Sequence, residues 1–227
     1  MPEIGNCLEG HLLPIDHVYD LYTLVRVLVI RFEGWSIVSL KKTRRVLKLI
    51  LVGDPGVGKT SLIAQYVHAK FKHSYQVTIG LDVSSKNVEL VGPKGAEMVR
   101  MSIHDIGGQD RFVTIRHLFY PGAHLAMLVY DVTRPQSLEN LQSIWSAELA
   151  QYNPPKEGGQ NVRKILVGNK ADLEDLRMVS QEDGDAAAKA MGCVSHLLAS
   201  AKENQNVDVA FKTLAESFLQ SSGVYQK

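Results

Sequence analysis

The stretch VLKLILVGDPGVGKT, residues 46–60, determines the fold class of this chain. Residues 46–52 form a short apolar run with several β-branched side chains, which predicts a buried strand. Residues 53–60 then fit the pattern G-x-x-x-x-G-K-[ST], and residues 59–69 predict a helix. A glycine-rich turn between strand and helix directs backbone N–H groups at an anion, and the helix N-terminus adds positive potential. The stretch therefore predicts a phosphate-binding loop rather than an ordinary turn.

Two side chains of this loop have predicted roles of their own. Lys59 is expected to reach the β- and γ-phosphates of a nucleotide, and the Thr60 hydroxyl is expected to ligate Mg²⁺. The other nucleotide contacts in this stretch are assigned to Asp54, Pro55, Gly56, Val57, Gly58 and Ser61.

A second motif, GNKAD at residues 168–172, indicates which base is bound. It follows an apolar run, at the carboxyl edge of a sheet where doubly wound folds bind ligands. Guanine offers an N1–H and N2–H₂ donor pair that the Asp172 carboxylate can accept bidentately, whereas adenine does not. Asn169 suits the N7/O6 side of the base and ties loops together, and the Lys170 stem can cover the base plane. The motif thus favours GTP and argues against a P-loop ATPase or kinase.

Strand and helix patterns alternate along residues 46–220, and this alternation predicts the fold class. We expect an α/β fold with a mostly parallel six-stranded sheet, one antiparallel edge strand and helices on both faces. The turn VGPKGAE makes a hairpin of the second and third strands. Strands are expected at 46–52, 81–91, 97–105, 123–130, 162–167 and 193–198, and helices at 59–69, 110–118, 135–151, 180–191 and 203–220. The helix at 135–151 has Leu138, Leu141, Ile144, Trp145 and Leu149 at helical spacing.

The order and spacing of these motifs resemble the Ras superfamily of small GTPases over roughly residues 46–220, with the Ras-like G domain as the implied fold. Further matches to the superfamily are DIGGQ at 105–109 and SAK at 200–202. Within the superfamily the chain is most similar to the Rab family. The segments that carry this closer similarity are IGLDV (79–83), DRF (110–112), FYPGAH (119–124) and YDVT (130–133).

The resemblance implies a role for each residue that matches a family motif. Thr78 would ligate Mg²⁺ only when a γ-phosphate is bound, and Asp105 would hold Mg²⁺ through water. The Gly108 N–H would meet the γ-phosphate, and Gln109 would orient the attacking water. With Lys59 neutralising charge, the implied catalytic group is Gln109, Lys59, Thr78 and Gly108. Further implied nucleotide contacts are Phe71 against the guanine, Tyr75 over the phosphates, and Ser200, Ala201 and Lys202, with the Ala201 N–H at guanine O6.

Four positions depart from the family pattern. His104 and Val83 replace aromatic residues on which much of the Rab effector surface rests, so the identity of partners does not transfer. Gly107 replaces the usual alanine, and it either loosens the segment that follows or only matches an Arf-type pattern. Pro55 takes the loop position nearest the γ-phosphate, where we expect binding to survive and an arginine finger to be crowded.

These features predict a switch that binds GTP or GDP with Mg²⁺ and hydrolyses GTP slowly, because no arginine finger is recognisable within the chain. The expected partners are protein effectors, an exchange factor and a GTPase-activating protein. The alternative is a nucleotide-bound scaffold with little hydrolysis. Gln109 favours the switch, whereas Pro55 and Gly107 keep the scaffold open.

Composition limits the other classes of function. A formal charge of +1 with 22% charged residues argues against a broad electrostatic grip on nucleic acid. Cys7 and Cys193 lack metal-type spacing and indicate two reduced thiols in a cytosolic protein, with one disulfide left open.

The first part of the chain does not follow the strand–helix alternation. We divide the sequence into an amino-terminal extension of uncertain fold (1–44), a G domain (45–221) and a short tail (222–227). Residues 18–40 are apolar but interrupted by charges, so no transmembrane helix is expected, and helix and strand are both open.

The two ends of the sequence indicate where in the cell the protein is expected to act. The final residues SSGVYQK contain no cysteine, so no prenylation site is expected, and Pro2 excludes N-myristoylation. We expect a cytoplasmic protein, with peripheral membrane contact left open and location set by the extension. Packing on the G domain, binding to a partner and contact with a membrane interface are the alternatives for residues 18–40.

Overall fold

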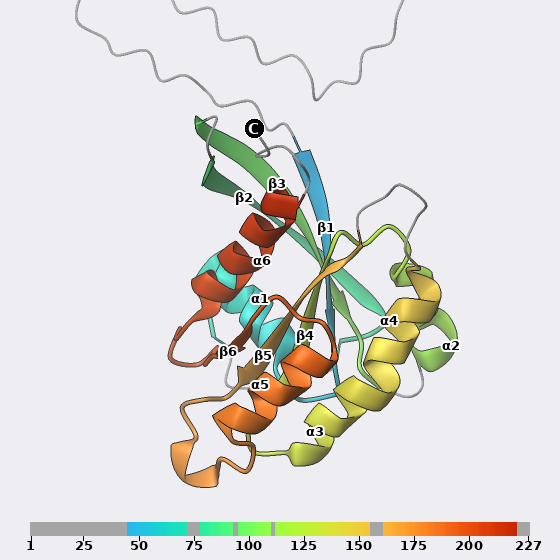
Figure 1. Cartoon of the computed structure of the whole chain (residues 1–227), viewed down its shortest axis with the longest axis vertical. Coiled ribbons are helices and arrows are strands. Elements are labelled where there is room, and N and C mark those ends of the chain that lie inside the picture. The colour runs from blue at the N-terminus through green and yellow to red at the C-terminus, as the bar shows by residue number, and fades with distance from the viewer. Residues whose placement is uncertain (1–44, 72–77, 93–94, 110–111, 155–160, 222–227) are drawn as a thin grey trace, which may run out of the picture. The chain divides into compact units, whose positions relative to one another are not determined.

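The computed structural model describes residues 45–71, 78–92, 95–109, 112–154 and 161–221 (Figure 1). The predicted extension, the tail and Tyr75 lie outside the described residues. Within the described ranges, no helix combines the length and apolar character needed to cross a membrane.

The described residues form a six-stranded sheet in the order β2-β3-β1-β4-β5-β6. Only β2 and β3 pair antiparallel, and every other neighbouring pair is parallel. The predicted fold class is therefore confirmed, including the antiparallel edge strand. The strands are β1 (Arg45–Val52), β2 (Leu81–Gly92), β3 (Gly95–Ile106), β4 (Leu125–Asp131), β5 (Arg163–Asn169) and β6 (His196–Leu198).

Helices cover both faces of the sheet, as Figure 1 shows. Helices α1 and α6 pack on one face, and the helical stretch from α3 to α4 packs with α5 on the other. The helical elements are α1 (Lys59–His68), α2 (Val113–Arg116), the 3₁₀ turn η2 (His117–Phe119), α3 (Pro135–Asn140), the π-turn η3 (Leu141–Trp145), α4 (Ser146–Tyr152), the 3₁₀ turn η4 (Glu174–Leu176), α5 (Gln181–Ala190) and α6 (Val207–Ser221).

The central strand β1 shows why the chain folds into three layers. Leu49 and Leu51 face the core beneath α1 and α6, whereas Ile50 and Val52 face the core beneath α3, α4 and α5. All four residues are 0% exposed. Because both faces of the strand are buried, its sequence is a continuous hydrophobic run rather than an alternating pattern. In the first core, the rings of Tyr66 from α1 and Phe211 from α6 stack at 3.8 Å. The apolar run predicted as a buried strand is thus an interior strand of the sheet, with β3 on one side and β4 on the other.

The helix predicted at 135–151 differs from the observed one. A π-turn, η3, interrupts the helical stretch, with the Ser146 N–H donating to the Leu141 carbonyl. Ile144, expected at the packed face, is 44% exposed, while Trp145 is 2% exposed.

Two predicted boundaries near the carboxyl end were also wrong. Helix α6 begins at Val207 rather than at residue 203, because Asn204 and Asn206 have φ of 55° and 56°. The intervening turn is closed by a bridge between Ser200 and Gln205. Strand β6 has three residues and starts at His196, because only residues 196–198 pair with β5.

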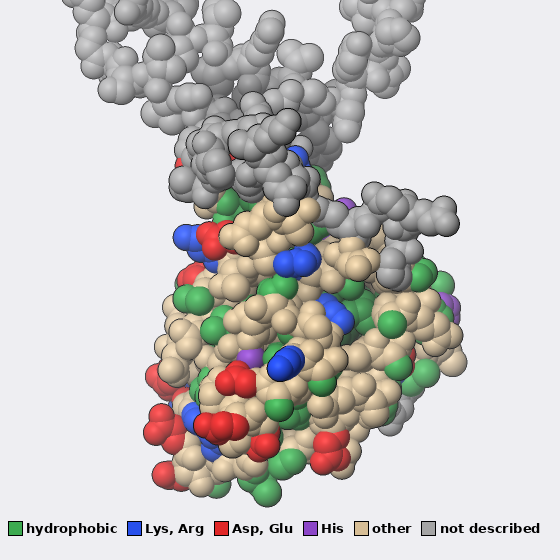
Figure 2. Space-filling view, in the orientation of Figure 1, with side chains coloured by type: hydrophobic (Ala, Val, Ile, Leu, Met, Phe, Trp, Pro, Cys, Tyr) green, Lys and Arg blue, Asp and Glu red, His purple; other side chains and the backbone are tan. Residues whose placement is uncertain are grey.

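Charges on the face drawn in Figure 2 are unevenly placed. Lys and Arg side chains are scattered among neutral atoms, whereas Asp and Glu side chains gather toward the lower end.

Candidate functional site

The predicted phosphate loop connects the end of β1 to the start of α1. Its glycines adopt backbone angles that other residues rarely take, with φ of 140° at Gly53, 75° at Gly56 and 99° at Gly58. A Cβ at Gly53 would overlap the Val129 carbonyl oxygen, and one at Gly58 would overlap the Asn169 side-chain nitrogen. The sequence pattern is therefore a steric requirement of the loop and of what packs against it.

Lys59 is the buried cation of this loop. Its side chain is 6% exposed, and its ammonium donates to the carbonyls of Gly53 at 2.6 Å and Asp54 at 3.0 Å. Burial lowers the pKa of Lys59 to about 8, although the nearby carboxylates of Asp105 and Asp54 raise it in part. The arrangement holds a cation inside the curve of the loop, where phosphates are expected.

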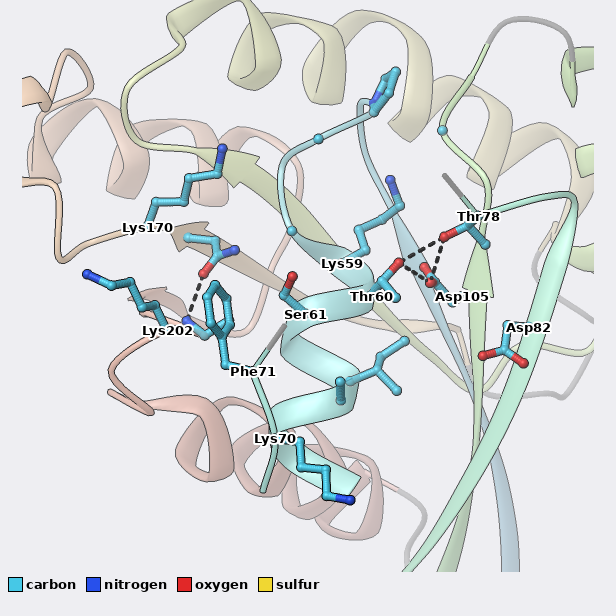
Figure 3. Close-up of a pocket in the computed structure, with 18 of the residues that line it drawn as sticks. Lys59, Thr60, Ser61, Lys70, Phe71, Thr78, Asp82, Asp105, Lys170 and Lys202 are labelled. Atoms are coloured by element: carbon cyan, nitrogen blue, oxygen red, sulfur yellow. Dashed lines mark hydrogen bonds between the residues drawn. The ribbon is translucent and has the colours of Figure 1, made fainter. Parts of the chain in front are cut away.

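Three oxygen-bearing side chains meet beside Lys59 (Figure 3). The hydroxyls of Thr60 from α1 and Thr78, which precedes β2, lie 2.8 Å apart. Both donate to Oδ2 of Asp105 from β3, at 2.5 and 3.2 Å. The other oxygen of Asp105 is buried without a hydrogen-bond partner among the described residues. Hard oxygen donors with one unpaired carboxylate oxygen fit a Mg²⁺ ion, so these residues suit the predicted metal.

The residues predicted to recognise the base lie at the other end of the loop. Asn169, which is 2% exposed, donates from Nδ2 to the Val57 carbonyl at 2.8 Å. Its Oδ1 accepts the Ala201 N–H at 3.2 Å. Asn169 thus joins three loops, and its expected contact with the base stays a prediction.

The Asp172 carboxylate is fixed by its neighbours. Ser200, which is 0% exposed, donates from Oγ to Oδ1 of Asp172 at 2.6 Å, and the Lys202 ammonium lies 3.8 Å from Oδ2. Lys170 has φ of 68° and directs its ammonium to the buried Asp131 carboxylate at 2.5 Å. Asp131 and Ser200 therefore orient the side chains that the motif predicted to face the base.

Both groups of residues line one cavity of about 710 Å³. In Figure 3, Phe71, Lys170 and Lys202 lie at one end, and Lys59, Thr60, Thr78 and Asp105 lie at the other. The predicted residues in the lining are Pro55, Gly56, Gly58, Lys59, Thr60, Ser61, Phe71, Thr78, Asp105, Gly108, Gln109, Asn169, Lys170, Asp172, Ala201 and Lys202.

Three predicted contacts do not line this cavity. Val57 and Ser200 are 0% exposed, and Val57 contributes its carbonyl to Asn169. The Asp54 carboxylate instead accepts from Asn140 and Trp145 on the helical stretch behind the loop. The spacing of the motif gave no sign of these three packing roles, because they depend on what lies behind the loop.

Gly107 and Gly108 bring the segment after β3 against the phosphate loop. A Cβ at Gly108 would lie 2.7 Å from the Gly53 carbonyl oxygen and 2.8 Å from the Pro55 nitrogen. A Cβ at Gly107 would lie 2.9 Å from the Thr78 carbonyl oxygen. Gly107, whose N–H donates to the Gly80 carbonyl at 2.9 Å, is thus closely packed, and its effect on the segment that follows stays a prediction.

Comparison with known proteins identifies relatives over most of the chain. The Ras family model matches residues 48–220. The GTP-binding protein ypt2 of Schizosaccharomyces pombe is 42% identical over 177 residues, covering 78% of this chain and 83% of the relative. The Ypt/Rab-type GTPase YPT7 of Saccharomyces cerevisiae is 40% identical over 185 residues, covering 80% and 85%. The Ras-related protein Rab7 of Pisum sativum is 39% identical over 183 residues, covering 79% and 85%.

Proposed function

The chain belongs to the Ras family and is a Rab-like GTPase, and from that premise we propose that it is a Mg²⁺-dependent switch that hydrolyses GTP slowly. In this proposal the GTP and GDP states differ through contacts of the γ-phosphate with Thr78 and Gly108.

The observation that supports this proposal most is that one cavity is lined both by the phosphate loop and by an oriented carboxylate. Lys59 and the loop glycines lie at one end, and Asp172, held by Ser200, lies at the other. A nucleotide that spans the cavity would place its phosphates and base at groups of matching chemistry. Guanine fits Asp172 because its two adjacent donors match the two carboxylate oxygens.

The metal would be held by Thr60 and Thr78, with Asp105 acting through water. Bound there, Mg²⁺ would neutralise the phosphate oxygens and orient them. The protein supplies the remaining charge through Lys59, which is already positioned by two loop carbonyls.

Hydrolysis requires a positioned water and stabilisation of charge on the transferred phosphoryl group. Gln109 lines the cavity next to Gly108, so its amide is suited to orient a water molecule. Among the described residues that line the cavity there is no arginine. Arg134 donates to the Pro55 carbonyl at 3.0 Å but is not part of the lining. We therefore propose slow intrinsic turnover and stimulation by a partner that supplies an arginine.

Partner proteins would bind the segments that are expected to contact the γ-phosphate. Exposed apolar side chains lie on the segment around the start of β2 and on α2 and η2, a pattern that suits protein partners. They are Ile79, Val83, Val113, Ile115 and Leu118. We propose a role in membrane trafficking for this Rab-like chain, and its cytoplasmic location with peripheral membrane contact stays a prediction.

Nucleotide competition tests the base assignment. GTP and GDP should displace a fluorescent guanine nucleotide from the full chain, whereas ATP should not. Asp172→Asn should weaken GDP binding by about 100-fold or more and improve binding of xanthosine diphosphate, because the donor–acceptor sense at C2 of the base inverts. Equal competition by ATP would refute the assignment.

A single-turnover assay separates the switch from the scaffold. The full chain loaded with GTP and Mg²⁺ should convert it to GDP within hours, and phosphate release measures this conversion. GTP that persists unchanged for a day, with and without an activating protein, would favour the scaffold.

A further inference from the structure

Asp54 anchors the phosphate loop from behind. Its Oδ1 accepts the Trp145 indole N–H at 2.9 Å, and its Oδ2 accepts the Asn140 side-chain amide at 2.8 Å. Both donors belong to the helical stretch formed by α3, η3 and α4. The position of the loop therefore depends on the orientation of the Trp145 side chain.

The π-turn η3 makes this anchor possible. Asn140 and Trp145 are five residues apart, which in a regular α-helix would separate their directions by about 140°. In η3 the Ser146 N–H instead donates to the Leu141 carbonyl, five residues earlier. The wider turn brings residues five apart toward one face, and both side chains reach the same carboxylate. A turn of this kind is rare and often marks a functional position.

The ring of Trp145 makes a second contact, with Arg116 of α2. The guanidinium of Arg116 lies 4.2 Å from the centre of the indole ring. Arg116 is 4% exposed and binds Glu148 of α4 through two nitrogens, one of them Nε at 2.8 Å. The Tyr120 hydroxyl donates to the same carboxylate at 3.0 Å. A planar guanidinium is suited to make the carboxylate pair and the ring contact together.

The chain of contacts thus runs from α2 to the phosphate loop. Arg116 lies in the helix that follows the DIGGQ motif, and Asp54 lies within the loop itself. Separating a buried arginine from its carboxylate leaves two charges uncompensated, so partly detached positions of α2 are unfavourable. If α2 has a docked and a released position, this buried contact would couple that change to the phosphate loop.

We propose that Arg116 is a positioning residue which, through Glu148 and Trp145, couples the docking of α2 to the phosphate loop and slows nucleotide release. The inference rests on the proposed function, because it takes the loop to hold a guanine nucleotide. In this proposal a change in the position of α2 alters the rate of nucleotide release, although α2 itself does not contact the nucleotide.

The fluorescence of Trp145 provides a direct test. The chain has two tryptophans, so Trp35→Phe leaves Trp145 as the single emitter. In this background we expect the emission to differ between the GDP form and the form loaded with a non-hydrolysable GTP analogue, because α2 moves its cation relative to the ring. Arg116→Met should abolish the difference and accelerate release of a fluorescent GDP about fivefold or more, the lower range of coupling between sites.

Two further variants separate positioning from general stability. Arg116→Lys keeps the charge but not the two-nitrogen pair, so its release rate should lie between those of the parent and Arg116→Met. Arg100→Met removes an exposed arginine of β3 and should release GDP at the parent rate. If Arg116→Met does not fold, Trp145→Phe, which removes the N–H donor and retains an aromatic ring, should itself accelerate release.

The results that would overturn the proposal are distinct. Parental release rates in Arg116→Met and Trp145→Phe, with tight GDP binding in all proteins, would refute the coupling and leave the GTPase assignment intact. A lower melting temperature in Arg116→Met with unchanged release and an unchanged emission difference would show a structural role only. A parent that binds no guanine nucleotide would overturn the proposed function and this inference together.

Discussion

The two ends of the cavity are built in different ways. At the base end, Asp172 and Asn169 accept hydrogen bonds from Ser200 and from the Ala201 N–H, and the buried Asn169 also bonds the phosphate loop. At the phosphate end, the Thr60 and Thr78 hydroxyls lie 2.8 Å apart and both donate to one oxygen of Asp105, whose second oxygen has no partner within the described structure.

From this difference we infer which end of the cavity keeps its structure when GTP becomes GDP and which end changes. The base end is held by contacts between elements of the packed domain, so under the proposed function we expect it to present the same groups to GTP and GDP. The phosphate end brings together three segments, and its hydroxyl and carboxylate oxygens can exchange hydrogen bonds for contacts to a metal and a γ-phosphate. A switch needs this combination, because it must keep its nucleotide while it responds to one phosphate.

The largest expected effect comes from a change that breaks both ends. Gly58→Ala would place a Cβ against the Asn169 amide at a φ of 99°, and should weaken GDP binding by about 100-fold or more through strain and loss of the loop tie. Titration with a fluorescent GDP measures the loss.

The matched control is Gly56→Ala, in the same loop. Its φ is 75°, but a Cβ there would have no atom within 4 Å, so only backbone strain of roughly 1–2 kcal/mol is expected. Equal losses in the two variants would show that the contact with Asn169 is unimportant.

A smaller effect should be confined to the phosphate end. Gln109→Leu removes the amide expected to orient water and leaves the loop unchanged, so GTP hydrolysis should slow by about 10- to 100-fold with GTP affinity nearly constant. Single-turnover phosphate release and nucleotide titration on the same preparation measure the two quantities. Hydrolysis at the parent rate, with and without an activating protein, would contradict the role of Gln109.

The smallest effect should appear at the base end. Ser200→Ala removes the hydroxyl that donates to Asp172 and accepts the Glu203 N–H at 3.0 Å. We expect GDP and GTP affinities to fall together by about 3- to 10-fold, which corresponds to the net contribution of one typical intramolecular hydrogen bond. Isothermal titration with each nucleotide measures this, and a loss for GTP alone would show that the base end is not the constant part of the site.

The bounds of helices and strands were predicted well where they depend on residues that are neighbours in the sequence. The strand at 46–52 and the helix that follows the phosphate loop lie within one residue of their predicted bounds. Irregular geometry was predicted less well. The π-turn η3, the left-handed residues before α6 and the short β6 depend on hydrogen bonds that periodicity does not contain.

Most of the residues predicted for the site line one cavity, because the motifs place glycine, lysine, threonine and aspartate in loops that end neighbouring strands, while their contacts to a nucleotide stay predictions. Asp54 shows the limit of that reasoning. Its position in the motif suggested a nucleotide contact, yet its carboxylate turns to Trp145 and Asn140, about ninety positions away in the chain by their numbering. The sequence also placed Trp145 only by its helical spacing, without its partners.

The sequence by itself determined the order of strands and helices, the phosphate loop and the preference for guanine, because each follows from neighbouring residues whose backbone angles or donor pattern allow little else. Only the tertiary structure decided that Gly107 is closely packed, that Asp105 meets two threonines from other segments, and that Arg116 reaches the phosphate loop through Trp145. The physical reason is that these contacts join residues distant in sequence, and their distances are set by how the helices pack against the sheet.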